Sequence, residues 1–173
     1  AAVTWVLMSW AHTGKPSVVG AASGAVAGLV AITPASGWVG PMAAIIIGIA
    51  AGTICYAAIA FKSARKWDDA LDVWGVHGMG GLTGAILTGT LASPHVWDTG
   101  DGIGAWTGTP EGMEQQAISI LGALISIGYA FGVTLVILKV MDAVWPGGIR
   151  VTPKEEEIGL DLAQHGERAY VNE

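Results

Sequence analysis

Long apolar runs, each bounded by turn-forming and charged residues, are the strongest constraint on this chain. They cover residues 1–11, 17–32, 39–61, 72–91 and 117–138. A helix rises about 1.5 Å per residue and needs about 20 apolar residues to cross a bilayer. The last three runs reach that length, whereas the second ends at Thr33-Pro34, where proline opposes continuation of a helix. We predict an all-α polytopic membrane protein with four spans, preceded by the end of another helix in the first run.

The composition supports closely packed helices in lipid. Of the 173 residues, 52% are hydrophobic and 13% are charged, and the mean hydropathy is +0.55. Small residues recur at four-residue spacing on the apolar runs: Gly20, Gly24 and Gly28; Gly48 and Gly52; Gly80, Gly84 and Thr88; Gly128 and Gly132. Such spacing places small residues on one helix face, where they let helix backbones approach each other. The sequence therefore predicts a helical bundle rather than a single anchor.

The chain offers little for metal or redox chemistry. Cys55 is its single cysteine and lies in an apolar run, where we expect a small buried side chain. The other candidate ligands, His12, His95 and His165, are too scattered to give the spacing of a metal site. We therefore expect no metal and no cofactor. The net charge of −6 is concentrated in loops and in the tail, and it does not indicate a nucleic-acid partner.

The basic residues fall in alternate connections between the runs. They are Lys15, Lys62, Arg65, Lys66, Lys139, Arg150, Lys154 and Arg168. Because basic residues favour the cytoplasmic side, this distribution predicts a cytoplasmic C-terminus. We divide the chain into a transmembrane domain, residues 1–145, and a cytoplasmic tail, residues 146–173. In that tail, Lys154–Glu157 can form a short helix after Thr152-Pro153.

The segment "GVHGMGG" places His77 inside the fourth apolar run. An ionisable side chain is costly in a bilayer and commonly faces a cavity or a partner, so we predict a functional role for it. A neutral imidazole donates a hydrogen bond at one ring nitrogen and accepts one at the other. Such a ring can pass a small polar molecule or a proton along a dry path. The alternative is a neutral histidine that is hydrogen-bonded in a packed core.

Other polar residues near the runs have simpler expected roles. Asp68, Asp69 and Asp72 precede the fourth run, where carboxylates favour a helix N-terminus, and we expect capping to account for two of them. Ser23 and Thr33 can bond back to carbonyl groups in their own helix.

A second function remains open at this stage. Ser23, in "AASG", and His77, one span later, resemble the serine and histidine of rhomboid intramembrane proteases. A hydroxyl within hydrogen-bond reach of an imidazole can be activated as a nucleophile. Against this alternative, Ala21 stands where that family has glycine, and the tail has no place in it.

Three stretches of the chain resemble the Amt/Mep/Rh family of ammonium transporters. They are "GKPSVVGAASGAVAGLVAITPASGWVGP" (14–41), "DDALDVWGVHGMGGLTGAILTG" (68–89) and "GIRVTPKEEEIGLDLAQHGERAYV" (148–171). The resemblance implies the ammonium-transporter fold, in which ten of eleven helices form two inverted repeats. This chain would hold the second repeat, from the end of helix 7 to helix 11, plus the tail. It further implies a homotrimer in the inner (cytoplasmic) membrane.

The resemblance also assigns roles to residues of the pore. His77 matches the second of two histidines that face each other in the middle of the pore, and the first belongs to the other repeat. Val73 would line the cytoplasmic side of the pore, and Asp72 would lie near its inner exit. Ser23 and Thr33 carry over as residues close to the pore. The implied function is transport of ammonium, which gives up its proton because a charge is costly in an apolar pore, and ammonia then passes His77.

The stretch "GLDLAQHGERAY" resembles the tail region through which prokaryotic members couple to P-II signalling proteins. This implies regulatory contacts for Gly159, Asp161, His165, Gly166 and Tyr170. A third function, a sensor that binds ammonium without conducting it, would use the same tail.

Overall fold

The computed structural model describes residues 1–96 and 103–167, whose regular structure is entirely helical. The α-helices are α1 (Ala2–Thr13), α2 (Val18–Ile32), α3 (Pro41–Ala64), α4 (Met79–Leu91), α5 (Pro110–Val144) and α6 (Pro153–Ile158). Short 3-10 helices follow α2 and precede α5, and π-helical turns precede α4 and follow α6. The chain forms two compact units, Ala1–Ile125 and Ser126–Glu173. The predicted all-α class is confirmed.

Three helical segments of the described residues are long and apolar enough to cross a bilayer. They are Val18–Ala35, Pro41–Ala64 and Pro110–Val144. The fourth predicted span differs from the expectation of one continuous helix beginning at Asp72. Asp72 has a φ of 56°, a π turn occupies Trp74–Gly78, and α4 itself begins only at Met79. The continuous hydropathy of residues 72–91 conceals this division, because hydropathy does not report the backbone conformation.

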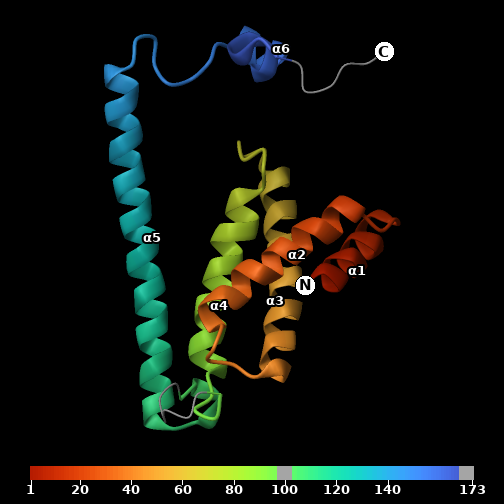
Figure 1. Cartoon of the computed structure of the whole chain (residues 1–173), viewed down its shortest axis with the longest axis vertical. Helices are drawn as coiled ribbons and strands as arrows, with labels where there is room; N and C mark the ends of the chain where they lie inside the picture. Colours follow the sequence, from red (N-terminus) through yellow and green to blue (C-terminus); the bar gives the residue numbers. More distant parts are fainter. Residues whose placement is uncertain (97–102, 168–173) are drawn as a thin grey trace. The chain divides into compact units, whose positions relative to one another are not determined.

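In the first unit, α2 runs obliquely across α3 and α4, and α1 packs beside it (Figure 1). Two clusters of buried side chains fill these crossings. Trp5, Ala27, Cys55 and Val76 form one cluster; Ala31, Ala35, Ile47 and Ala51 form the other. Three of the four residues in the second cluster are alanines, so small side chains hold the helices at short separations there. Cys55 is fully buried, as predicted.

The glycines at the helix crossings show how close the backbones come. A Cβ added at Gly84 on α4 would overlap the backbone carbonyl of Ala31 on α2. A Cβ at Gly24 would lie 2.6 Å from the Cβ of Trp5, and one at Gly52 would lie 2.8 Å from the side chain of Thr4. At these positions the packing role predicted from spacing is confirmed. Gly128, by contrast, meets no neighbour among the described residues.

The connection from α4 to α5 is tied to the end of α4 by several hydrogen bonds. The carbonyl of Ala92 accepts from the backbone N–H of Gly104 at 2.9 Å and from the indole N–H of Trp106 at 2.8 Å. The hydroxyl of Thr90 donates to the Gln116 side chain at 2.8 Å. These bonds fix the first turns of α5 within the first unit.

The second unit comprises the remainder of α5 and the tail. Gly147 and Gly148 both have positive φ, so the chain turns sharply after α5. The backbone N–H of Ile149 donates to the Asp142 carboxylate at 3.1 Å, which stabilises this turn. The predicted short helix is confirmed as α6.

We predict that Gly84→Ala destabilises the folded protein by about 1–3 kcal/mol, since an added methyl group must push α4 away from the Ala31 backbone. The measurement is unfolding of the full protein in mixed detergent micelles. Gly81→Ala on the same helix is the matched control, because a Cβ at Gly81 meets nothing among the described residues. Equal stability of the two variants would show that the α2–α4 crossing tolerates separation.

Candidate functional site

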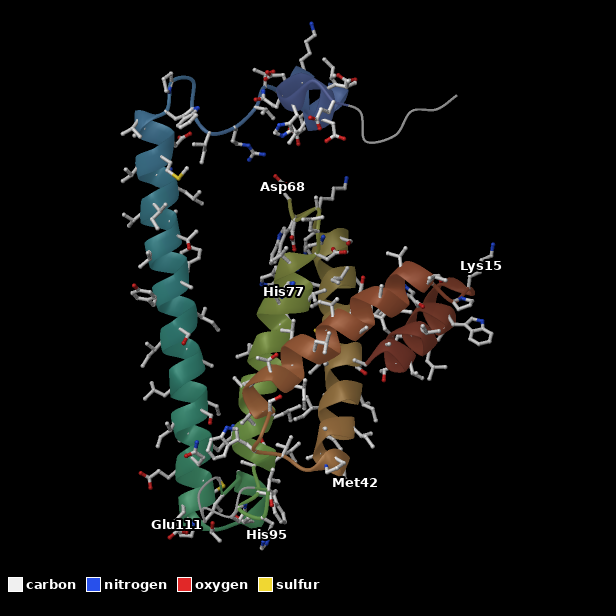
Figure 2. All side chains as sticks on the ribbon, in the orientation of Figure 1. Lys15, Met42, Asp68, His77, His95 and Glu111 are labelled. Atoms are coloured by element: carbon white, nitrogen blue, oxygen red, sulfur yellow. The ribbon has the colours of Figure 1, made fainter. Side chains whose placement is uncertain are left out.

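His77 lies in the π turn that connects the α3–α4 loop to α4. The backbone N–H of Met79 donates to the carbonyl of Trp74, five residues earlier, which is the hydrogen bond that defines this turn. Figure 2 shows His77 on the ribbon that leads into α4, between Asp68 at one end and His95 at the other. Single π turns within helices occur frequently at functional sites. The direction of the His77 side chain is therefore set by an irregular turn rather than by a regular α-helix.

The start of the π turn is capped by Asp69. Its two carboxylate oxygens accept from the backbone N–H groups of Val73 at 2.9 Å and Trp74 at 3.0 Å. Free N–H groups at a helix start need such acceptors, and a carboxylate also suits the positive end of the helix dipole. Capping by an aspartate is confirmed, but the structure assigns it to Asp69 and gives Asp72 a different role.

Asp72 forms an ion pair with Lys62, which lies in the last turn of α3. Lys62 is buried, with a residue exposure of 6%, and its Nζ donates to Asp72 Oδ1 at 2.5 Å and to the carbonyl of Asp69 at 2.6 Å. A buried ammonium group is tolerated only where it is paired and hydrogen-bonded. Lys62 therefore joins the end of α3 to both sides of the turn that precedes Val73.

The side chains of His77 and Val73 are exposed on the surface of the first unit, and Asp72 is half-buried. Within the described residues, His77 is therefore not enclosed in a packed core, which the alternative of a hydrogen-bonded core histidine would require. Val73 lies four residues before His77, next to the capped turn. The structure brings these three residues together at one corner, between the end of α3 and the start of α4.

Ser23 and Thr33 use their hydroxyl groups within α2 and the 3-10 turn that follows it. Ser23 donates to the carbonyl of Val19 at 3.1 Å, and Thr33 donates to that of Leu29 at 2.6 Å. Both bonds match the simple expectation for helical hydroxyls. No hydrogen bond joins Ser23 to His77 within residues 1–96 and 103–167, so the structure does not show an activated serine.

The tail residues fall around a second π turn, Asp161–His165. Gly159 and Gly166 lie on either side of it with φ values of 95° and 68°. This region favours glycine, so the backbone conformation alone explains a glycine at each position. Asp161 and His165 are exposed and therefore accessible to a partner. Tyr170, predicted to belong to this set, lies outside the described residues.

A capping box begins α6. The Thr152 hydroxyl accepts from the Glu155 N–H at 3.3 Å, while the Glu155 carboxylate accepts from the Thr152 N–H at 2.8 Å and from the Thr152 hydroxyl at 2.7 Å. Gln164 of the π turn donates to the other carboxylate oxygen at 3.0 Å. These bonds from Thr152, and the weaker one from Gln164, favour the charged carboxylate and hold the pKa of Glu155 below its usual value. Glu155 therefore links α6 to the turn that carries Asp161 and His165.

In the part of the chain that the structure describes, no group of three or more His, Cys, Asp or Glu side chains could hold a metal ion. The candidate site therefore consists of hydrogen-bonding, ionic and apolar groups.

Similarity to known proteins identifies the family. The profile of the Ammonium Transporter Family matches residues 1–170. The chain belongs to the ammonium transporter family. The ammonium transporter Amt1 of Archaeoglobus fulgidus is 44% identical over 170 residues, which cover 98% of this chain and 41% of Amt1. The ammonium transporter of Aquifex aeolicus is 47% identical over 171 residues, which cover 98% of this chain and 38% of that protein. The chain thus spans less than half the length of these relatives.

Solved structures of relatives share the fold. Mep2 of Candida albicans is 38% identical with a TM-score of 0.81, over 94% of this chain and 36% of Mep2. A protein described as a sensor Amt protein is 28% identical with a TM-score of 0.77, over 94% of this chain and 38% of its own. The predicted ammonium-transporter fold is therefore confirmed. These relatives are not proteases, which, together with the hydrogen bond of Ser23 to its own helix, disfavours the rhomboid-like alternative.

Sequence reasoning missed the roles of Lys62 and Cys55. The charge pattern identifies Lys62 only as a loop charge that reports orientation, whereas its position directly after the apolar run ending at Phe61 is the one signal for its burial. The thiol of Cys55 lies 3.8 Å from the carbonyl of Val76, the residue before His77, as a weak hydrogen-bond donor. These contacts have no sequence pattern, since they join α3 to residues 7, 10 and 21 positions later in the chain.

We predict that the tail becomes less ordered in acid because of Glu155. Its lowered pKa means that the carboxylate stabilises the folded tail at neutral pH, and that this stabilisation is lost as the pH falls through the lowered pKa. Hydrogen exchange should show weaker protection of the α6 amides below the ordinary glutamate pKa of about 4.3 than at neutral pH.

The matched variants for this measurement are Glu155→Gln, which should lose the pH dependence, and Glu157→Gln, which should keep it because Glu157 is exposed on the same helix. A pH dependence that survives in Glu155→Gln would assign it to another group.

Proposed function

We propose that this chain is part of a transporter that moves ammonium across a membrane as ammonia, through a narrow pore lined by His77. The observation that carries the proposal is the placement of His77. In a chain of this family, an exposed imidazole occupies a membrane-length run, at a corner that is held by three charged residues. Intramembrane ionisable residues commonly mark the path of a substrate or a proton.

The transported form follows from desolvation. Ammonium carries a charge that is costly to move into an apolar passage, whereas ammonia is neutral and needs only hydrogen bonds. An imidazole can supply both a donor and an acceptor to ammonia. In this mechanism the recruited cation loses its proton before the pore, and ammonia passes His77 and a facing histidine from another part of the protein.

The neighbouring residues fit the cytoplasmic part of such a path. Val73 offers an apolar wall four residues before His77. Asp72 lies near the inner exit, and its pairing with Lys62 offsets its charge. Ser23 and Thr33 are proposed to lie close to the pore, with their hydroxyl protons engaged within the helix.

The membrane placement is proposed from helix lengths and charge. The apolar side chains of α5 are exposed along its length, with Gly112 alone buried among the described residues, which suits contact with lipid or with other helices. We place the protein in the inner (cytoplasmic) membrane as a homotrimer, with the tail on the cytoplasmic side by the positive-inside rule.

The tail is proposed as a contact for a P-II signalling protein. The capping box and the bond from Gln164 to Glu155 give residues 152–166 a defined conformation, and the side chains of Asp161 and His165 are exposed. Gly159 and Gly166 permit the turns on either side, and Tyr170 completes the proposed contact. A sensor function would use the same tail but would show no flux.

The test of the proposed function is uptake of labelled methylammonium by cells or liposomes containing the full-length protein. We expect His77→Ala to lower the initial rate by about tenfold, which corresponds to about 1.4 kcal/mol in the transport barrier. His95→Ala is the matched control, because His95 is an exposed loop histidine at the other end of α4 (Figure 2). Unchanged uptake in His77→Ala would refute a role for this histidine.

The protease alternative has a separate readout. A fluorophosphonate probe should not label the protein, since Ser23 bonds to its own helix. Labelling that is present in the wild type and lost in Ser23→Ala would support the protease and count against transport.

A further inference from the structure

The corner beside His77 contains two unusual backbone conformations. Lys66 and Asp72 have φ values of 55° and 56°, and they are the only residues other than glycine with positive φ in the described ranges 1–96 and 103–167. This left-handed conformation is unfavourable for an L-residue. Both residues lie in the short connection from α3 to the π turn, so the connection must be held by interactions that offset this cost.

Lys62 provides such interactions at Asp72 itself and at Asp69, three residues before it. Its ammonium group binds the Asp69 carbonyl and the Asp72 carboxylate simultaneously. Asp69 in turn caps the N–H groups at the start of the π turn. The buried side chain of Lys62 therefore holds both Asp69, which caps the π turn, and Asp72, which lies just before the turn.

The backbone transmits this constraint to His77. The carbonyl of Asp72 accepts from the N–H of Val76 at 2.9 Å, so the first hydrogen bond of the turn is made by the residue that Lys62 holds. Val76 is buried against α3, and its carbonyl faces the Cys55 thiol. A Cβ added at Gly75 would overlap the side chain of Ile59, so α3 also presses directly on the turn. His77 follows Val76 immediately, and its own exposed ring makes no hydrogen bond, ion pair or ring-to-ring contact within the described residues.

We propose that Lys62 is a positioning residue for His77, acting through Asp69 and Asp72 to hold the π turn that directs the imidazole. This inference rests on the proposed function, because it assigns a part of the pore machinery to a residue that does not touch the substrate. A purely stabilising lysine would affect the amount of folded protein but not the surroundings of the His77 ring in the protein that does fold.

The test uses the full-length protein with ¹⁵N-labelled histidine in lipid bilayers. Solid-state NMR reports the ring nitrogens of each histidine, and the His77 signal is assigned by its absence in His77→Gln. Methylammonium uptake, normalised to the amount of folded protein, is measured on the same variants. The His95 signal serves as an internal reference at the other end of α4.

The variants are chosen to separate positioning from folding. Lys62→Met removes the ammonium group but leaves Asp72 unpaired. The double variant Lys62→Met, Asp72→Asn leaves no unpaired charge, and asparagine tolerates the left-handed conformation. It therefore remains informative where the single variant fails to fold. Lys66→Met is the matched control, because Lys66 is exposed in the same connection and undergoes the same substitution.

We expect the double variant to shift the His77 ring signals, to leave those of His95 in place, and to lower uptake about tenfold, while Lys66→Met changes neither. An unshifted His77 signal in the double variant would overturn the proposal, as would a shifted signal with wild-type uptake. If the wild-type protein shows no uptake, the proposed function fails, but the NMR comparison still decides whether Lys62 positions the ring.

Discussion

Close approach of helix backbones at positions without side chains is the constraint on which the first unit depends. Gly84 meets the Ala31 backbone, and Gly24 meets Trp5, at distances that no Cβ could occupy. In lipid, burial of apolar surface gives little drive for helices to associate, so van der Waals contact at short separation must supply it. The buried alanines Ala27, Ala31 and Ala51 suit the same geometry, since their small side chains let neighbouring helices lie close together.

This close packing also explains the form of the corner beside His77. The α3 helix lies so near the π turn that a Cβ at Gly75 would overlap the Ile59 side chain and Val76 is buried. The connection from Arg65 to Val73 must then bring the chain from the end of α3 into a turn packed on α3 itself. Two left-handed residues and a buried lysine accomplish this within a few residues. The irregular turn thus follows from a short connection between tightly packed helices.

Hydropathy and spacing predicted the positions of most helices, because both depend on residues near one another in the sequence. The ends of α2, the short helix α6, the self-bonding of Ser23 and Thr33, and the burial of Cys55 were all inferred in this way. The break at Asp72 and the π turn were not, because residues 72–91 remain apolar throughout and a bond between Trp74 and Met79 leaves no trace in hydropathy. The burial of Lys62 depends on contacts with Asp69 and Asp72, which only the folded connection brings together. The roles of His77 and of the tail residues stay predictions.

The ionic character of this corner needs an explanation beyond stability. In this pair Lys62 is buried and Asp72 is half-buried, and such a pair contributes little net stability compared with well-packed apolar side chains, because desolvation of the charges offsets their attraction. The ion pair instead specifies one conformation of the connection. Lys62 can bond to the Asp69 carbonyl and the Asp72 carboxylate together in few arrangements, whereas apolar side chains could pack in many. It also offsets the charge of Asp72. An unpaired carboxylate at the inner end of the proposed path would attract ammonium and favour recapture of a proton there, while a paired carboxylate presents a weaker field. A path for neutral ammonia is therefore better served by an aspartate whose charge is already matched within the protein.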